Sequence, residues 1–226
     1  MKIAIGNRKG GVGTSTLACN VSAAFAVTGH SVLLVDTDAS RTSTAWCMRR
    51  HALALEPSLA VVTARRSTTA ALDNDDPYDI RLVDVWRHHD AMEAIAGRVD
   101  FWLAPCIASR PDLDATLQLY ETFRRDGWRH PTEPAPFGVV LTQTPSAWGP
   151  RWEAYARSYL SEHSPELHVF RQSLHSRRAW QETFSGRALF ELPNRVAGKA
   201  LAEFNSFLKE LAASLNATEM TRPTTT

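Results

Sequence analysis

Eight residues near the N-terminus have the composition of a phosphate-binding loop: Lys9, Gly10, Gly11, Val12, Gly13, Thr14, Ser15 and Thr16. A glycine-rich turn between a strand and a helix lets backbone N–H groups surround phosphate oxygens, and the helix N-terminus adds partial positive charge. Ser15 stands where the hydroxyl of such a loop ligates Mg²⁺. The segment therefore predicts a site for a phosphorylated ligand and a magnesium ion.

The loop departs from the ordinary pattern GxxxxGK[ST] at two positions. Arg8 stands in place of the first glycine, and Thr14 stands in place of the lysine. Losing a charge-assisted phosphate contact costs about 1.5–3 kcal/mol, which is roughly 10- to 100-fold in affinity. Binding can survive such a loss, whereas phosphoryl transfer depends more heavily on charge neutralisation. Arg8 could restore part of the charge; the alternative is a structural turn that no longer binds nucleotide.

Three aspartates follow apolar runs that read as strands. Asp36 and Asp38 come after the second run, and Asp84 ends a later one. The carboxyl ends of parallel strands meet at one edge of a sheet, which is where such sheets bind ligands. We therefore predict a magnesium site at the edge where Asp36, Asp38 and Asp84 meet the loop serine Ser15; the alternative is a set of polar strand ends that only cap loops.

Arginines are frequent in the C-terminal third of the chain, among them Arg157, Arg171, Arg177 and Arg178, and could form a local basic patch. Glutamates are interspersed with them, so a solvated face of balanced charge is an equally good interpretation. If the arginines bind DNA, the affinity should fall steeply with salt because phosphate contacts release counterions.

The elements that must position these residues alternate between strand and helix. Strands are predicted at residues 2–6, 31–35, 59–63, 80–83, 101–104, 139–142 and 167–170. Helices are predicted at residues 14–28, 40–50, 88–97, 111–125, 149–163, 177–185 and 195–215. This alternation predicts an α/β fold with a doubly wound, mostly parallel sheet and helices on both faces.

Length and composition fit one domain at residues 1–216, followed by a disordered polar tail at residues 217–226. The chain has 226 residues, 44% of them apolar, and a net charge of +1, so attraction to nucleic acid would need a local patch. The cysteines Cys19, Cys47 and Cys106 show no metal-ligand spacing, which predicts free thiols in a reducing compartment. No apolar run is long enough for a membrane span, so a cytoplasmic location is expected.

Three segments together resemble the ParA/MinD family of P-loop ATPases. Residues 9–13 resemble the family's deviant KGGxGK[ST] loop, residues 35–38 (VDTD) its DxD segment, and residues 78–84 (YDIRLVD) the strand that ends in the Walker B aspartate. Residues 43–46 (STAW) resemble the small plasmid-partition branch, whose members include ParF-like proteins. The resemblance implies the P-loop NTPase fold with ATP or ADP and Mg²⁺ as cofactors.

The resemblance also implies roles for individual residues. Lys9 would reach across a nucleotide-sandwich homodimer to the partner's phosphates, while the second lysine, which contacts the β- and γ-phosphates of its own nucleotide, is absent. Asp38 would orient or activate the attacking water, with Lys9 as the other catalytic residue. Asp36 would lie near the magnesium waters, and Asp84 would hold the ion through water. Trp86 departs from the small or proline residues common in this switch segment.

Two functions follow as expectations. The first is a partition ATPase for a plasmid or mobile element, which forms an ATP-dependent dimer, binds nonspecific DNA on the nucleoid and responds to a small ParB-like, centromere-binding adaptor. The alternative is a slow or non-hydrolysing regulatory module, of a conjugation accessory or cellulose-synthesis type, that positions a protein partner. An iron–sulfur reductase with a similar loop is excluded because Cys47 and Cys106 do not stand in the required pattern.

Overall fold

The computed structural model describes residues 1–64, 68–73, 77–125, 136–145 and 149–220. Its strands are β1 (Lys2–Ile5), β2 (Val32–Asp36), β3 (Ala60–Thr63), β4 (Ile80–Asp84), β5 (Phe101–Ile107), β6 (Phe137–Thr144), β7 (His168–Val169) and β8 (Leu174–His175). Its α-helices are α1 (Thr14–Val27), α2 (Thr42–Ala52), α3 (Thr68–Asp73), α4 (His89–Ala96), α5 (Arg110–Arg125), α6 (Gly149–His163), α7 (Arg178–Glu182) and α8 (Asn194–Met220).

The strands form one sheet in the order β3-β2-β4-β1-β5-β6-β7, with β8 also paired to β6. Every pairing among these strands is parallel, as expected for strands joined by helical crossovers. Asp84 pairs in register with Ile5 on one side and with Asp36 on the other. The loop after β1 and the two aspartates therefore leave the sheet at the same edge.

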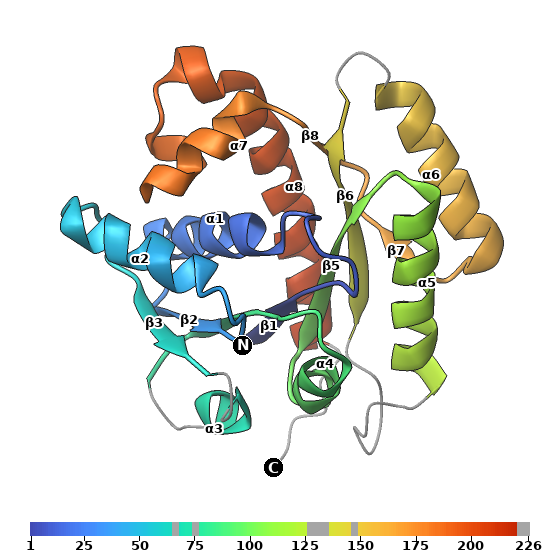
Figure 1. Cartoon of the computed structure of the whole chain (residues 1–226), viewed down its shortest axis with the longest axis horizontal. Coiled ribbons are helices and arrows are strands. Elements are labelled where there is room, and N and C mark those ends of the chain that lie inside the picture. Colours follow the sequence, from blue (N-terminus) through green and yellow to red (C-terminus); the bar gives the residue numbers. More distant parts are fainter. Residues whose placement is uncertain (65–67, 74–76, 126–135, 146–148, 221–226) are drawn as a thin grey trace.

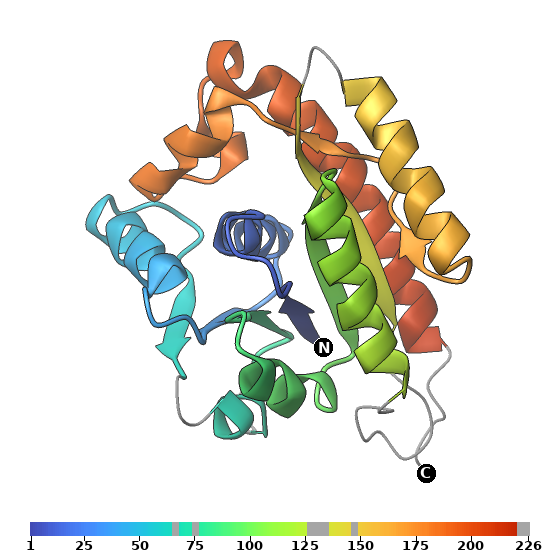
Figure 2. The same ribbon diagram turned by 45° about the vertical axis from the view of Figure 1, so that its right-hand side comes forward.

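Helices cover both faces of the sheet (Figures 1 and 2). The core on one face is formed with α1, α2, α7 and α8, and includes Ile5, Leu34 and Leu82 from the central strands. The core on the other face is formed with α3, α4, α5 and α6, and includes Val35 and Val83. Because successive strand residues point to opposite faces and both faces are buried, the strands read as continuous apolar runs. The doubly wound fold is confirmed.

Two buried side chains of α2 join the N-terminal strands to the C-terminal segment. The indole Nε1 of Trp46 donates to the Thr183 carbonyl oxygen at 2.7 Å. The fully buried guanidinium of Arg50 forms a bidentate ion pair with Glu191, with both N–O distances at 2.7 Å. A buried arginine needs such a partner because an unpaired charge in the core is costly. This bridge fixes the C-terminal segment beside the edge of the sheet.

The element boundaries differ from the sequence-based expectations in a few places. Neither α3 nor β8 was predicted, because each is too short to show a clear hydrophobic period. The predicted helix at 177–185 is the short α7 followed by a 3-10 turn at Thr183–Ser185. Helix α8 continues to Met220, so the first four residues of the expected tail are helical, and residues 221–226 lie outside the described residues.

None of the described helices is both long and apolar enough to cross a membrane. Within the same residues all three cysteines are buried free thiols.

Candidate nucleotide-binding site

The glycine-rich loop connects β1 to α1, as predicted, and its backbone is shaped for an anion. Gly13 precedes the helix with φ of 94° and Gly11 has φ of 80°, a left-handed conformation that only glycine adopts without strain. Gly13 has no side chain to cap α1, and the first turn of the helix carries no acidic residue. The N–H groups of that turn are therefore left for an anion, which is the arrangement that binds phosphate.

Two side chains of strand β6 form hydrogen bonds to the backbone of the loop. The Thr142 hydroxyl donates to the Val12 carbonyl oxygen at 2.8 Å, and the Gln143 amide donates to the Gly11 carbonyl oxygen at 2.5 Å. Both bonds tie the backbone of the loop to β6, and both side chains also line the cavity beside the loop. Sequence reasoning missed these two residues because they are far from the loop in the chain and carry no motif.

Asp36 is buried at the end of β2 and accepts three hydrogen bonds. Its Oδ1 accepts from the Asp38 backbone N–H at 3.0 Å, and its Oδ2 accepts from the Thr44 N–H at 2.8 Å and the Thr44 hydroxyl at 2.7 Å. These bonds fix the turn that carries Asp38 and the first turn of α2. The structure thus gives Asp36 an organising role at the predicted position.

Asp84 is buried beside Asp36 at the end of β4. The Ser43 hydroxyl donates to its Oδ2 at 2.8 Å, and the Ser15 hydroxyl of the loop lies near enough to this carboxyl group to lower its pKa. The pKa of Asp84 is raised to about 7, mainly by burial and also by the nearby charges of Asp36 and Asp38, against the lowering effect of the two hydroxyls. A cation at this position would favour the ionised carboxylate.

The oxygen groups at this edge suit magnesium. Within the described ranges no three His, Cys, Asp or Glu side chains are arranged to hold a metal ion directly. Mg²⁺ commonly keeps several waters and uses one or two carboxylates with phosphate oxygens, so Ser15, Asp36 and Asp84 fit an ion bound together with a nucleotide. The structure therefore brings Ser15, Asp36 and Asp84 together, and we expect Mg²⁺ to bind there with the nucleotide.

Asp38 is partly exposed and lines a pocket that the glycine-rich loop also lines. Its Oδ1 accepts from the Ser40 N–H at 2.8 Å, which holds the side chain against its own turn. Lys9 is exposed on the loop at the rim of the pocket. Both predicted catalytic residues therefore face the pocket that the loop lines.

A cavity of about 630 Å³ extends from the loop to the C-terminal segment, a size that suits a nucleotide. Its far end is lined by Leu174, His175, Arg177, Trp180 and Phe184, from β8, α7 and the turn that follows. Apolar and aromatic side chains there can pack against a base.

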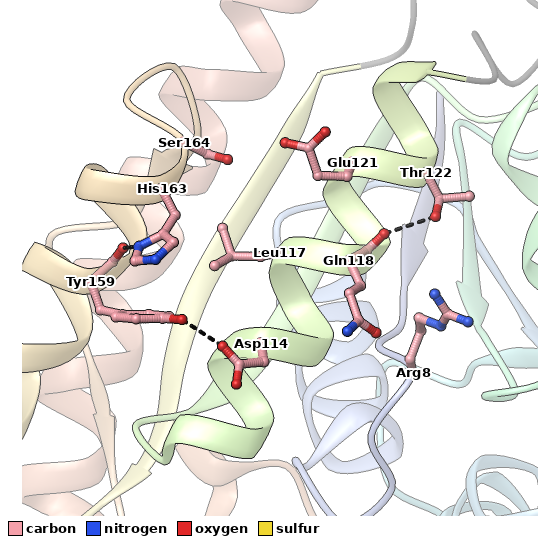
Figure 3. A pocket seen from close by; sticks show the side chains of 9 residues that line it. All are labelled: Arg8, Asp114, Leu117, Gln118, Glu121, Thr122, Tyr159, His163 and Ser164. Atoms are coloured by element: carbon pink, nitrogen blue, oxygen red, sulfur yellow. Dashed lines mark hydrogen bonds between the residues drawn. The ribbon is translucent and has the colours of Figure 1, made fainter.

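Arg8 points away from the cavity. It lies beside α5 and lines a second, open groove between α5 and α6, together with Asp114, Gln118 and Tyr159 (Figure 3). The expectation that Arg8 could replace the missing loop lysine is therefore not supported. The cation that does lie against the loop is Arg87, which lines the nucleotide cavity three residues after Asp84.

The segment around Arg87 is held by a short chain of hydrogen bonds. The Thr37 hydroxyl donates to the Asp84 carbonyl oxygen at 2.9 Å and accepts from the Trp86 N–H at 2.8 Å. The Trp86 ring packs on His88, with centroids 4.2 Å apart. The bulky Trp86 thus belongs to a fixed turn, and it lines the same cavity as Arg87.

The four arginines predicted to bind DNA have unequal surroundings. Arg157 is half-buried and its guanidinium donates to the carbonyl oxygens of Phe170 at 2.7 Å and Arg171 at 2.8 Å, and to the Ser173 hydroxyl at 3.0 Å. Burial lowers the pKa of Arg157. The side chain therefore braces the connection between β7 and β8.

Arg177 forms an ion pair with Glu203, and its Nε lies 3.1 Å from both carboxylate oxygens. Arg178 is exposed and pairs with Glu182 one helical turn away at 3.0 Å. Arg171 is exposed as well. Two of the four, Arg171 and Arg178, are thus open to solvent, and their DNA-binding role stays a prediction.

Comparison with known proteins gave matches at two levels. A family model described as an AAA domain matches residues 1–85, the segment that contains the glycine-rich loop and all three aspartates. No curated protein matched the sequence.

Solved structures match almost the whole chain. The apo structure of McdA from Cyanothece superposes with a TM-score of 0.70 at 17% identity, covering 93% of this chain and 98% of that one. A putative plasmid partition protein from Borrelia burgdorferi bound to AMPPNP gives 0.66 at 17%, covering 92% and 98%. The septum site-determining protein MinD from Pyrococcus horikoshii, complexed with Mg-ADP, gives 0.65 at 17%, covering 95% and 98%. The resemblance read from the sequence is thus confirmed, and the chain has the ParA/MinD-type P-loop fold.

Proposed function

We propose that this protein binds ATP or ADP with Mg²⁺ and forms an ATP-dependent sandwich homodimer that positions the DNA of a plasmid or mobile element. The observation that carries the proposal is the convergence of the glycine loop with Asp36, Asp38 and Asp84 at one edge of the sheet, around a cavity of about 630 Å³. The similarity in fold to a putative plasmid partition protein bound to AMPPNP adds support.

The proposal assigns a role to each part of the site. The N–H groups of the loop and of the first turn of α1 bind the phosphates. Magnesium, when bound, neutralises phosphate charge, and Ser15 and Asp84 lie where they would hold it. Asp38, fixed by the carboxylate of Asp36 through its backbone N–H, would orient the attacking water and accept its proton.

Lys9 supplies the link between nucleotide and dimer in this proposal. Its side chain is exposed at the rim and has no hydrogen-bond or ion-pair partner in the part of the chain that the structure describes. A second copy facing this rim would offer its phosphates to Lys9, and that contact would exist only when nucleotide is present. The dimer would then bring the arginines of two chains together to bind nonspecific DNA, and a small ParB-like adaptor would stimulate turnover.

A second candidate is a slow or non-hydrolysing module that positions a protein partner. Thr14 favours it, because a loop without its own lysine loses charge neutralisation that matters more for phosphoryl transfer than for binding. Both candidates share the nucleotide-gated dimer and differ in turnover.

The test measures the oligomeric state by light scattering in Mg²⁺ with ATP, with ADP and without nucleotide. We expect a dimer only when ATP is present, and a monomer with ADP or without nucleotide. The variant Lys9→Ala should remain a monomer with ATP. The variant Arg8→Ala removes a neighbouring charge that lies outside the cavity and should dimerise like the unmodified protein. A monomer under all conditions would contradict the proposal.

Two further measurements separate the candidates. Steady-state phosphate release that disappears in Asp38→Ala would support the partition ATPase, as would DNA binding that requires ATP and weakens steeply with salt. Nucleotide-dependent dimerisation without phosphate release would support the second candidate.

A further inference from the structure

Arg87 lies against the glycine loop at its most crowded point. A Cβ atom placed on Gly10 would lie 2.5 Å from a terminal guanidinium nitrogen of Arg87, and 3.6 Å and 3.7 Å from its Cζ and Cδ atoms. The arginine thus extends along the backbone of the loop, in the space that any other residue at position 10 would fill.

Two arginines line the cavity, and they differ in their surroundings. Arg177 is paired with Glu203. Among the residues that the structure describes, Arg87 has no hydrogen-bond or ion-pair partner, although it lines the same cavity as Thr14 and Ser15. A guanidinium without a protein partner, next to a loop whose N–H groups can bind phosphate, is suited to a bidentate contact with phosphate oxygens.

The main chain near Arg87 is fixed. The N–H of Trp86 donates to the Thr37 hydroxyl, which is itself bonded to the Asp84 carbonyl oxygen. The guanidinium therefore has a defined starting point at the end of β4, close to the aspartate proposed to hold magnesium through water.

We propose that Arg87 supplies, within the same chain, the phosphate-contacting positive charge that Thr14 does not provide. The inference rests on the proposed nucleotide binding and adds that the cation comes from the segment after β4 rather than from the loop. Because Arg87 follows Asp84 by three residues, phosphate binding would also hold this segment in one conformation. The groove position of Arg8 excludes the neighbouring arginine from this role (Figure 3).

The test compares ATP and ADP dissociation constants by titration calorimetry in Mg²⁺, for the unmodified protein and for Arg87→Ala, Arg87→Lys and the control Arg8→Ala. We expect Arg87→Ala to weaken ATP binding about 10- to 100-fold, Arg87→Lys to weaken it less, and Arg8→Ala to leave it within about 2-fold, as expected for a surface change away from the site. Circular dichroism melting confirms that each variant is folded.

A rescue variant makes the test specific for charge at the phosphate. Adding Thr14→Lys to Arg87→Ala places a lysine at the position it occupies in the ordinary loop, and should restore most of the lost affinity. Failure of this rescue together with an effect of Arg87→Ala would indicate a structural role and overturn the inference.

A second measurement needs no substitution. Phenylglyoxal modification of the native protein, mapped by peptide mass spectrometry, should label Arg87 without nucleotide and be blocked there by ATP, while labelling of Arg8 stays unchanged. Unchanged ATP affinity in Arg87→Ala, or unprotected Arg87, would overturn this inference alone. Absence of ATP binding by the unmodified protein would overturn the proposed function as well.

Discussion

The two sides of the nucleotide cavity are built in opposite ways. On the carboxylate side, Asp36 and Asp84 are buried and accept hydrogen bonds from Thr44 and Ser43. On the cationic side, Lys9 and Arg87 are exposed, and neither has a polar partner within the described residues.

The difference has a physical reason. A buried carboxylate must be hydrogen-bonded to remain in the core, so the protein alone completes that side. An exposed cation is solvated by water and does not need a partner within the protein. The proposed partner of Arg87 is a phosphate of the nucleotide bound by the same chain, and that of Lys9 is a phosphate of the nucleotide bound by a second copy. Substitutions on the carboxylate side should therefore affect stability, and those on the cationic side only binding and assembly.

The largest expected effect tests Asp38. Asp38→Ala should lower ATP turnover by about 100-fold or more, because general-base assistance contributes about 10²–10⁴-fold. ATP affinity should change little, since among the described residues the side chain bonds only to its own turn. The measurement is phosphate release at saturating ATP beside calorimetric binding. Undiminished turnover would move the catalytic role elsewhere.

The next effect concerns the pH dependence of stability without nucleotide or metal. Because burial raises the pKa of Asp84 to about 7, the folded state holds a proton that the unfolded chain loses near pH 4. The free energy of unfolding should therefore fall as pH rises from about 4 to 7 and then level off. Asp84→Asn removes this slope, so its stability relative to the unmodified protein should rise by about 2–3 kcal/mol between pH 5 and pH 8.

Urea unfolding at the two pH values checks this prediction. Asp79 provides a matched control, because it is exposed and its pKa is lowered by hydrogen bonds from Ser31. Asp79→Asn should leave the same interval unchanged. Parallel pH profiles for Asp84→Asn and the unmodified protein would show that Asp84 is ionised throughout.

A smaller effect is expected for the hydroxyl that holds Asp36. Thr44→Val removes a 2.7 Å hydrogen bond to a buried carboxylate and should cost about 1–3 kcal/mol of unfolding free energy. Thr28→Val removes a bond to an exposed helix-end carbonyl oxygen and should cost less than about 0.5 kcal/mol. Equal losses in the two variants would mean that Asp36 does not depend on this contact.

The smallest effect is expected on the cationic side. Lys9→Ala should change the unfolding free energy by less than about 0.5 kcal/mol, because no contact among the described residues is lost. The same variant should lose ATP-dependent dimerisation. A clear loss of stability in Lys9→Ala would remove the contrast between the two sides.

Local patterns were enough to predict most of the fold. The apolar strands, the helix after the glycine loop and the aspartates at strand ends were all placed correctly, because each depends on neighbours within one turn or one strand. Short elements such as α3 and β8 were missed, since a few residues carry too weak a period. The parallel direction of the strands followed from the crossover rule, whereas the strand order and register that bring Asp36 beside Asp84 were visible only in the structure.

The sequence by itself determined the glycine loop, the positions of its candidate carboxylates and the absence of a lysine at Thr14. Only the tertiary structure decided which cations reach the loop. In it, Arg8 lies beside α5 and Arg87 lies along Gly10. The reason is that the position of a carboxylate at a strand end is set by the backbone of the sheet. The direction of a long, flexible side chain on a loop is set by the tertiary contacts around it.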